Sequence, residues 1–93
     1  MSWSIRFHPA IKKDLRRLSG EVRDLIVKKV FPVISKDPHI GEPLRGPLKG
    51  FWKYVIGEYR IAYSVDSKRK EMIILEVGPR GGFYERLRRR LEK

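Results

Sequence analysis

The second half of the chain carries side chains whose types and spacing fit chemistry on a phosphate group: Lys53, Arg60, Arg80 and Tyr84. A planar guanidinium donates to two phosphate oxygens at once, an amine serves as a charge or a base, and an aromatic ring stacks on a nucleobase. Such a set fits cleavage of RNA by attack of its 2′-OH on the adjacent phosphate, which requires a base, an acid and positive charge around phosphorus. We predict that these residues are catalytic.

Each of these residues has an expected role. Lys53 is the candidate base, because neither histidine of the chain lies in the segments that carry the set. Arg60 and Arg80 are expected to clamp the scissile phosphate, and Tyr84 is expected to stack on a base or orient the 2′-OH. The acid stays open, with Arg80 as one candidate. Any one of these residues alone would more often be a solvated charge or a packing aromatic, so the prediction rests on their combination.

The composition argues against a metal site. The chain has no cysteine, its two histidines, His8 and His39, are far apart in the sequence, and no group of Asp and Glu has the spacing of metal ligands. Cleavage through the 2′-OH needs no metal ion, because the nucleophile belongs to the substrate. We therefore predict metal-independent chemistry and no cofactor.

A β-hairpin is expected to hold Lys53 and Arg60. Residues 51–56 and 59–65 have the alternation of strands, and Gly57-Glu58 between them has glycine first, as a two-residue type II′ turn prefers. This register places position 55 opposite 60. One face then carries Lys53, Val55, Arg60 and Ala62, and the other carries the large side chains Trp52, Tyr54, Ile56, Tyr59, Ile61 and Tyr63. A slip of one residue would exchange the faces.

The rest of the chain predicts the elements that surround the hairpin. A first strand is expected at residues 3–7, followed by a helix that begins near Pro9 and ends at Ser19-Gly20. A second helix begins near Glu21 and should kink or stop at Pro32. Beyond a Pro- and Gly-rich loop at 36–50 and the hairpin, we expect a polar turn at 66–69, a third strand at 71–77 and a helix at 83–93.

The predicted order indicates an α+β fold, in which an N-terminal strand and a helical hairpin pack on an antiparallel sheet and a C-terminal helix follows, with the helices on one face of the sheet. With 93 residues, we expect one domain over 1–93. The 22 Lys and Arg against 11 Asp and Glu give a net charge of +11, which favours nucleic acid as partner, with an acidic protein or an anionic membrane surface as alternatives. No signal peptide or apolar span of about 20 residues is present, so we expect a cytoplasmic protein without membrane contact.

Two segments share their pattern with a known family. Phe51 to Tyr63 runs as aromatic, basic, alternating apolar, Gly-Glu, Tyr-Arg, apolar and Tyr. In the segment Val77 to Tyr84, an arginine is followed four residues later by a tyrosine, and the opening strand and two helices also fit. This chain resembles the RelE/ParE superfamily of toxins from type II toxin–antitoxin systems, and the resemblance spans essentially its whole length.

The resemblance to the RelE branch implies a RelE-like, microbial-ribonuclease-like fold and cleavage of mRNA in the ribosomal A site. It implies three partners: a cognate antitoxin from the same operon, the ribosome and mRNA. It also matches Lys53, Arg60, Arg80 and Tyr84 to active-site positions of the family. Further contacts to RNA or the ribosome are predicted at Arg45, Lys49, Arg86 and Arg89. The arginine run at 88–90 is most simply a solvated helix face.

Two positions depart from the RelE pattern. Val55 stands where RelE enzymes commonly have a second basic residue, and Pro79 stands where many relatives have a histidine. These departures keep two alternatives open: a ParE-like inhibitor of DNA gyrase without catalysis, and a degenerate, inactive toxin. The retained catalytic set favours the mRNA interferase.

Overall fold

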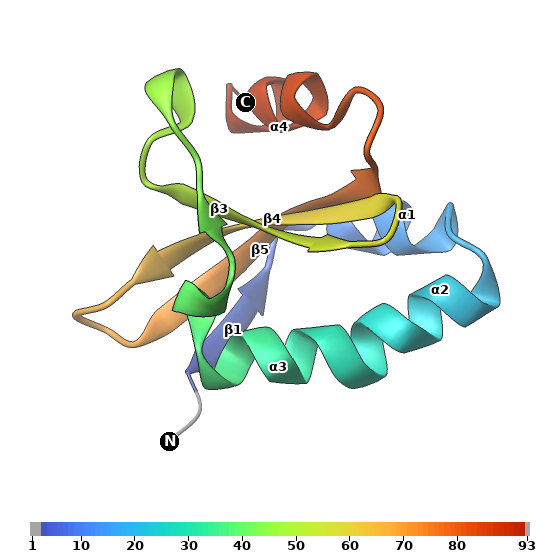
Figure 1. Cartoon of the computed structure of the whole chain (residues 1–93), viewed down its shortest axis with the longest axis horizontal. Helices are drawn as coiled ribbons and strands as arrows, with labels where there is room; N and C mark the ends of the chain where they lie inside the picture. Colours follow the sequence, from blue (N-terminus) through green and yellow to red (C-terminus); the bar gives the residue numbers. More distant parts are fainter. Residues whose placement is uncertain (1–2, 93) are drawn as a thin grey trace.

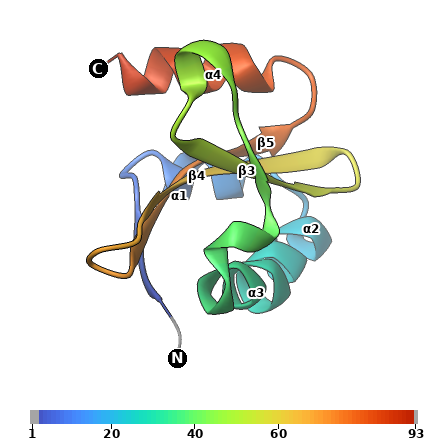
Figure 2. The ribbon, with the colours of Figure 1, turned by 60° about the vertical axis from the view of Figure 1, so that its left-hand side comes forward.

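The computed structural model describes residues 3–92 and shows a sheet with helices on both of its faces (Figures 1 and 2). The strand order is β1-β5-β4-β3-β2, antiparallel except for the parallel pair β1–β5. The elements are β1 (Ser4–Phe7), α1 (Ile11–Arg16), α2 (Gly20–Leu25), α3 (Phe31–Lys36), β2 (Glu42–Pro43), β3 (Phe51–Ile56), β4 (Tyr59–Asp66), β5 (Glu71–Pro79) and α4 (Phe83–Leu91). The predicted α+β class is confirmed. Lys93, which the last predicted helix included, lies outside the described residues.

The second helix does not stop at Pro32, which was one of the two outcomes predicted, because α2 and α3 continue into each other through a π-helical turn, Ile26–Val30 (Figure 1). The N–H of Phe31 donates to the carbonyl of Ile26, five residues back. A proline inside an α-helix collides with the carbonyl four residues before it. The wider π turn moves that carbonyl away, so the chain accommodates Pro32 without ending the helix.

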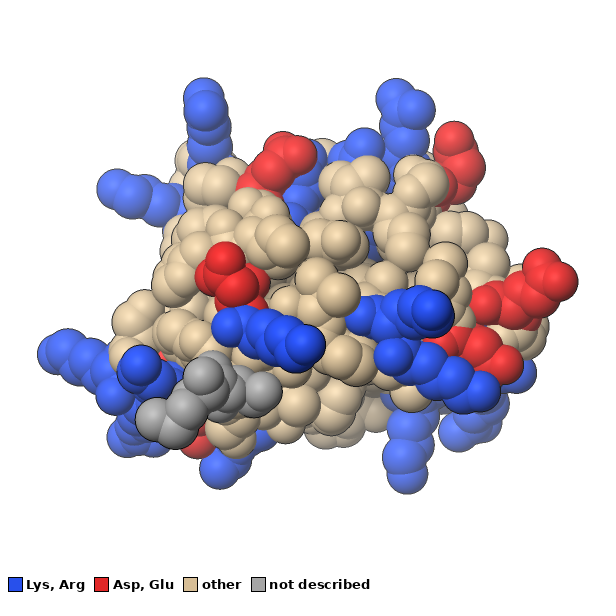
Figure 3. Space-filling view, turned by 60° about the horizontal axis from the view of Figure 1, so that its bottom comes forward, with Lys and Arg blue, Asp and Glu red and all other residues tan. Residues whose placement is uncertain are grey.

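The basic charge does not form one continuous patch on the side of α2 and α3. Seen from this side, Lys and Arg project mainly from the margin of the molecule, several of them beside acidic side chains (Figure 3). One such pair joins Lys28 and Asp24, whose charged atoms lie 3.8 Å apart on the surface. An exposed pair of this kind contributes little to stability.

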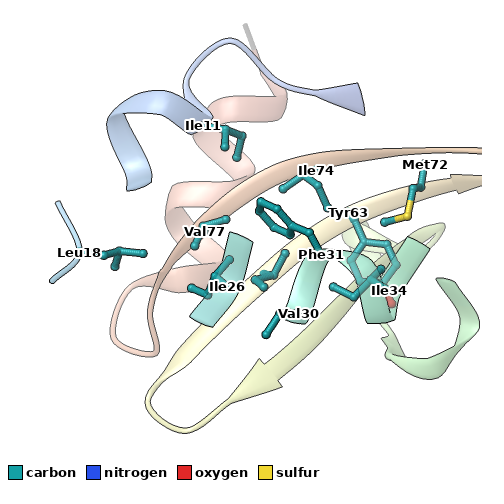
Figure 4. Packing of buried hydrophobic residues seen from close by; sticks show 11 residues of the cluster. Ile11, Leu18, Ile26, Val30, Phe31, Ile34, Tyr63, Met72, Ile74 and Val77 are labelled. Carbon is teal, nitrogen blue, oxygen red and sulfur yellow. The ribbon is translucent and has the colours of Figure 1, made fainter. Parts of the chain in front are cut away.

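The larger core lies between the α2–α3 layer and the sheet (Figure 4). Its centre contains Ile26, Ile34, Ile61, Tyr63, Met72 and Ile74, all fully buried. The hydroxyl of Tyr63 donates to the carbonyl of Pro38 at 2.6 Å, and burial raises the pKa of Tyr63 from 10.0 to about 12. The other large side chains of this face pack against the same core, as the hairpin pattern predicted.

The hairpin has the predicted register, with Val55 opposite Arg60 and Lys53 opposite Ala62. Gly57 has φ +57°, and among the described non-glycine residues only Lys70 has a positive φ. A positive φ at the first turn position alone is what a type II′ turn requires. Both hairpin strands therefore present the faces that the sequence predicts.

A second, smaller core lies on the opposite face, under α4 (Figure 2). Phe83 and Leu87 of α4 pack there with Ala62 and Leu75 of the sheet, and Leu44 and Leu48 close the cluster from the loop before β3. The expectation that helices cover only one face is therefore wrong. The apolar stripe of α4 requires a surface to cover, and the small side chain of Ala62 lets the helix approach.

The open edge of β5 is closed by a buried ion pair between α1 and α4. The strand β1 pairs with β5 only as far as Ile74, and beyond it the N–H of Val77 donates to Asp14 Oδ2 at 3.0 Å. Arg90 donates to both carboxylate oxygens of Asp14, at 2.5 and 3.0 Å, and to the carbonyl of Leu75 at 2.8 Å. The hydrogen bonds that Arg90 donates to Asp14 raise the pKa of Arg90. The interpretation of residues 88–90 as one solvated helix face thus fails at Arg90.

The Asp14–Arg90 pair gives a stability prediction. Arg90→Met leaves the carboxylate of Asp14 buried without its cation and should lower the free energy of unfolding by about 3 kcal/mol or more. Arg88→Met, an exposed position on the same helix, should change it by no more than about 0.5 kcal/mol. Urea denaturation measures both values, and equal losses in the two variants would contradict the assigned role of the pair.

Tyr63 gives a prediction about alkaline pH. Its folded-state pKa of about 12 lies above the ordinary 10.0, so the stability that it contributes is complete below pH 10 and is lost as the pH rises toward 12. Between pH 9 and 11.5 the wild type should lose about 2 kcal/mol more stability than Tyr63→Phe, which has no such proton. The check is urea denaturation of both proteins at both pH values, and parallel losses would refute the burial argument.

Candidate functional site

The structure brings Lys53 of β3 into contact with Tyr84 of α4. Lys53 Nζ donates to the hydroxyl of Tyr84 at 2.8 Å and lies 5.4 Å from the centre of its ring. The Lys53 side chain is only 16% exposed, whereas Tyr84 is 42% exposed. The ammonium occupies a lone pair of the phenol oxygen, so the phenol's own proton is free to point toward a bound molecule. Two of the predicted catalytic residues therefore form one unit.

An open groove of about 570 Å³ lies beside this unit. It runs between α4 and the loop before β3, and its lining consists of Glu42, Pro43, Leu44, Arg45, Leu48, Lys53 and Tyr84. Arg45, a predicted RNA contact, thus shares the groove with the Lys53–Tyr84 unit. Lys49 is exposed near it but does not line it. An open groove with two cations and one aromatic ring can take a strand of nucleic acid.

Glu42 is a member of the site that the sequence analysis missed. The short strand β2 places it opposite Lys53, and its Oε2 lies 3.9 Å from Lys53 Nζ. Its side chain is largely exposed, so the attraction is screened by water. A two-residue strand in a Pro- and Gly-rich segment has too little alternation to be recognised, and no other feature of the sequence pointed to Glu42.

Arg60 lies on the α4 side of the sheet, one strand farther from the groove. It pairs with Val55 on one side and with Gly78 on the other. The Nε of Arg60 is buried and has no hydrogen-bond partner among residues 3–92. Val55 is 41% exposed, so the position of the missing second basic residue faces solvent beside Arg60.

Arg80 follows the last residue of β5 and has an exposed side chain. Its backbone N–H donates to the carbonyl of Glu58 at 2.8 Å, which ties this position to the hairpin turn. Neither Arg80 nor Arg60 lines the groove. The predicted catalytic set is thus divided, with Lys53 and Tyr84 in contact at the groove and the two arginines outside its lining.

Arg86 and Arg89, both predicted RNA contacts, have different surroundings. Arg89 is exposed on α4, where its nearest acid is Glu85 at 3.3 Å. Arg86 points inward, and Nε donates to Oε1 of Glu76 at 2.6 Å. Its other nitrogens donate to backbone carbonyls. A guanidinium engaged in this way is not free for RNA, so the geometry argues against the prediction for Arg86.

Glu76 is the buried partner of Arg86 and was also missed. Its side chain is 1% exposed, and burial raises the pKa of its carboxyl above the usual range while the Arg86 guanidinium acts in the opposite direction. Its Oε2 has no hydrogen-bond partner in the described part of the chain. The signal was present, because an acid inside the apolar run of β5 implies a buried cationic partner. Asp14 gave the same kind of signal between Ile11 and Leu18.

Two other kinds of site, a metal centre and a membrane-spanning helix, are absent from residues 3–92. These residues contain no group of three or more His, Cys, Asp or Glu placed to hold a metal ion. None of the helices described is long and apolar enough to cross a membrane.

The sequence and the fold have counterparts among known proteins. Residues 5–88 match the model of the family described as ParE-like toxin of type II bacterial toxin–antitoxin system. The chain therefore belongs to this family, and the predicted membership of the RelE/ParE superfamily is confirmed. Among curated proteins it is similar to Toxin RelG of Mycobacterium tuberculosis, with 31% identity over 87 residues that cover 92% of this chain and all of RelG.

Solved structures of RelE proteins have the same fold. A chain of the toxin–antitoxin complex RelBE2 from M. tuberculosis matches with a TM-score of 0.79 and 30% identity, over 86% of this chain and 93% of that one. A mutant of E. coli toxin RelE in the free state matches with a TM-score of 0.74 over 97% and 94% of the chains; at 23% identity it supports the fold alone. The predicted RelE-like architecture is confirmed.

Proposed function

We propose that this type II toxin is a ribosome-dependent endoribonuclease that cleaves mRNA in the ribosomal A site. The observation that carries the proposal is the Lys53–Tyr84 unit at the edge of the groove, where a cation and a phenol from distant parts of the sequence share a hydrogen bond. Such a pair can exchange protons with a ribose hydroxyl and a phosphate. The retention of Arg60 and Arg80 adds the positive charge that the reaction requires.

The proposed reaction is transesterification within the RNA strand. The 2′-oxygen forms a bond to phosphorus, the bond from phosphorus to the 5′-oxygen breaks, and the products carry a 2′,3′-cyclic phosphate and a 5′-OH. The neutral amine form of Lys53 accepts the proton of the 2′-OH, and Tyr84 orients that hydroxyl or stacks on the adjoining base. Arg60 and Arg80 stabilise the charge that develops on the phosphate oxygens. The group that protonates the 5′-oxygen stays unassigned.

The ribosome supplies what this site lacks. No histidine lines the groove, so proton transfer depends on groups that are less suited to neutral pH. Holding the reacting atoms in line can lower a barrier by about 7–11 kcal/mol, and the ribosome would do this for mRNA in its A site. The net charge of +11 favours docking on ribosomal RNA, with Arg45, Lys49 and Arg89 as exposed contacts. The proposal requires the protein to act in the cytoplasm.

An antitoxin is the proposed protein partner. The RelBE2 structure, whose fold this chain shares, is a toxin–antitoxin complex. Charge complementarity predicts that an acidic segment of the cognate antitoxin covers part of the basic surface of this chain. Such a segment would compete with RNA for the same cations.

A second candidate function is inhibition of DNA gyrase without catalysis. The observation that favours it is Val55, which is exposed beside Arg60 where RelE enzymes commonly have a second basic residue. A site with one cation fewer stabilises the transition state less and cleaves more slowly. A large enough loss would leave the enzyme inactive. Retention of Lys53, Arg80 and Tyr84 keeps the ribonuclease as the preferred function.

The test is cleavage of a defined mRNA by the purified toxin in a reconstituted translation system. The wild type should cut within the A-site codon, and Arg80→Ala should reduce the cleavage rate by roughly 100-fold or more. The matched control is Lys28→Ala, which removes the same charge from the α2–α3 side and should cut like the wild type.

A parallel assay of gyrase supercoiling with the same protein separates the two candidate functions. Folded wild type that cuts no mRNA and blocks supercoiling would overturn the proposal in favour of gyrase. Absence of both effects would indicate an inactive toxin.

A further inference from the structure

The guanidinium of Arg86 points inward and hydrogen-bonds to the backbone on both sides of Arg80. Its Nη2 donates to the carbonyl of Pro79 and its Nη1 to the carbonyl of Gly81, each at 2.5 Å. These carbonyls belong to the residues immediately before and after Arg80. Together with the bond from the Arg80 N–H to Glu58, they fix the backbone of Arg80 at three points.

Two features of β5 hold the Arg86 guanidinium in place. Glu76, almost fully buried, accepts from its Nε at 2.6 Å and sets its orientation. Gly78 provides the space, because a Cβ at that position would lie 2.8 Å from Arg86 Nη2 and 3.2 Å from Glu76 Oε1. Any larger residue at 78 would displace the guanidinium. Strand β5 therefore forms a binding site for the Arg86 guanidinium, made of the carboxylate of Glu76 and the space beside Gly78.

A longer bond, from the N–H of Phe83 to the carbonyl of Arg80 at 3.3 Å, also holds this segment, which is rich in glycine. Arg80 is followed by Gly81 and Gly82, and Gly82 has φ +74° where the chain turns into α4. Glycines leave the backbone with many accessible conformations. Arg86 also closes the first turn of α4, since its N–H donates to the carbonyl of Gly82 at 3.0 Å. Arg86 therefore connects the backbone around Arg80 to the first turn of α4, the helix that carries Tyr84.

We propose that Arg86, which is hydrogen-bonded to Glu76 and packs against Gly78, is a positioning residue. It holds Arg80 in the orientation needed to bind the scissile phosphate. The inference rests on the proposed function, which assigns Arg80 to the phosphate. A catalytic group must be held within about 0.5 Å of its productive place by residues behind it. Arg86 acts on Arg80 through the backbone and does not touch the substrate.

A lysine at position 86 separates this role from simple stabilisation. Arg86→Lys keeps a cation beside Glu76, so no buried charge loses its partner, but one ammonium cannot reproduce the planar fork that spans both carbonyls. The matched control is Arg90→Lys, which makes the same change at the other inward arginine of α4. Arg90 contacts Asp14 and Leu75 and neither neighbour of Arg80.

The first readout is single-turnover cleavage of A-site mRNA at increasing toxin concentration. Arg86→Lys should lower the maximal rate by roughly 10- to 100-fold and leave the half-saturating concentration unchanged. Arg90→Lys should keep the wild-type rate. The double variant Glu76→Gln, Arg86→Met, which removes both buried charges together, should repeat the rate loss of Arg86→Lys. Equal loss in Arg86→Lys and Arg90→Lys, or a change confined to the half-saturating concentration, would overturn the proposal.

The second readout needs no activity and separates this inference from the proposed function. Hydrogen exchange measured by NMR on the free toxin should show faster exchange of the Arg80 amide in Arg86→Lys and unchanged exchange in Arg90→Lys. Equal protection in all three proteins would overturn the positioning role even if the wild type cleaves mRNA. Wild type that fails to cut mRNA but shows the expected exchange would remove the proposed function and leave Arg86 as the residue that holds Arg80.

Discussion

The two-residue turn at Gly57-Glu58 is the constraint on which the arrangement of the site depends. It sets the pairing of β3 with β4, and a shift of one residue would turn Lys53 and Arg60 toward the helices of the main core. The same turn is also bonded to the residue that follows β5, because the carbonyl of Glu58 accepts from the N–H of Arg80. The positive φ of Gly57 is thus linked to the placement of three predicted catalytic residues.

The helix α4 supplies Tyr84 to the site, and buried acids neutralise part of its positive charge. Its apolar stripe covers the second face of the sheet, and this docking brings Tyr84 to Lys53. Two of its arginines, Arg86 and Arg90, turn inward to buried acids, whereas the others face solvent. A net charge of +11 therefore overstates the positive charge available for RNA. Basic residues on one helix serve two purposes, and only the location of Asp and Glu elsewhere in the fold distinguishes them.

The sequence predicted the elements whose signal is local. Alternation and the turn glycine were sufficient for the hairpin and its register, and the apolar spacing after residue 83 was sufficient for α4. The features that it missed depend on partners far along the chain. Pro32 stays helical because of a backbone hydrogen-bond pattern that side chains do not reveal. The inward turn of Arg86 depends on Glu76 in another element, and Glu42 faces Lys53 only through a strand of two residues.

The claim that the 2′-OH of the mRNA is the nucleophile is tested most directly by removing that one oxygen atom from the substrate. Because the 2′-OH beside the scissile phosphate is the proposed nucleophile, an mRNA with a single 2′-deoxy nucleotide at that position in the A-site codon should resist the toxin. The unmodified mRNA should be cut there, leaving a 2′,3′-cyclic phosphate, and a deoxy substitution one codon away should have no effect. Cleavage of the modified codon at the normal rate would contradict the account, because the nucleophile would then have to be water or a group of the protein.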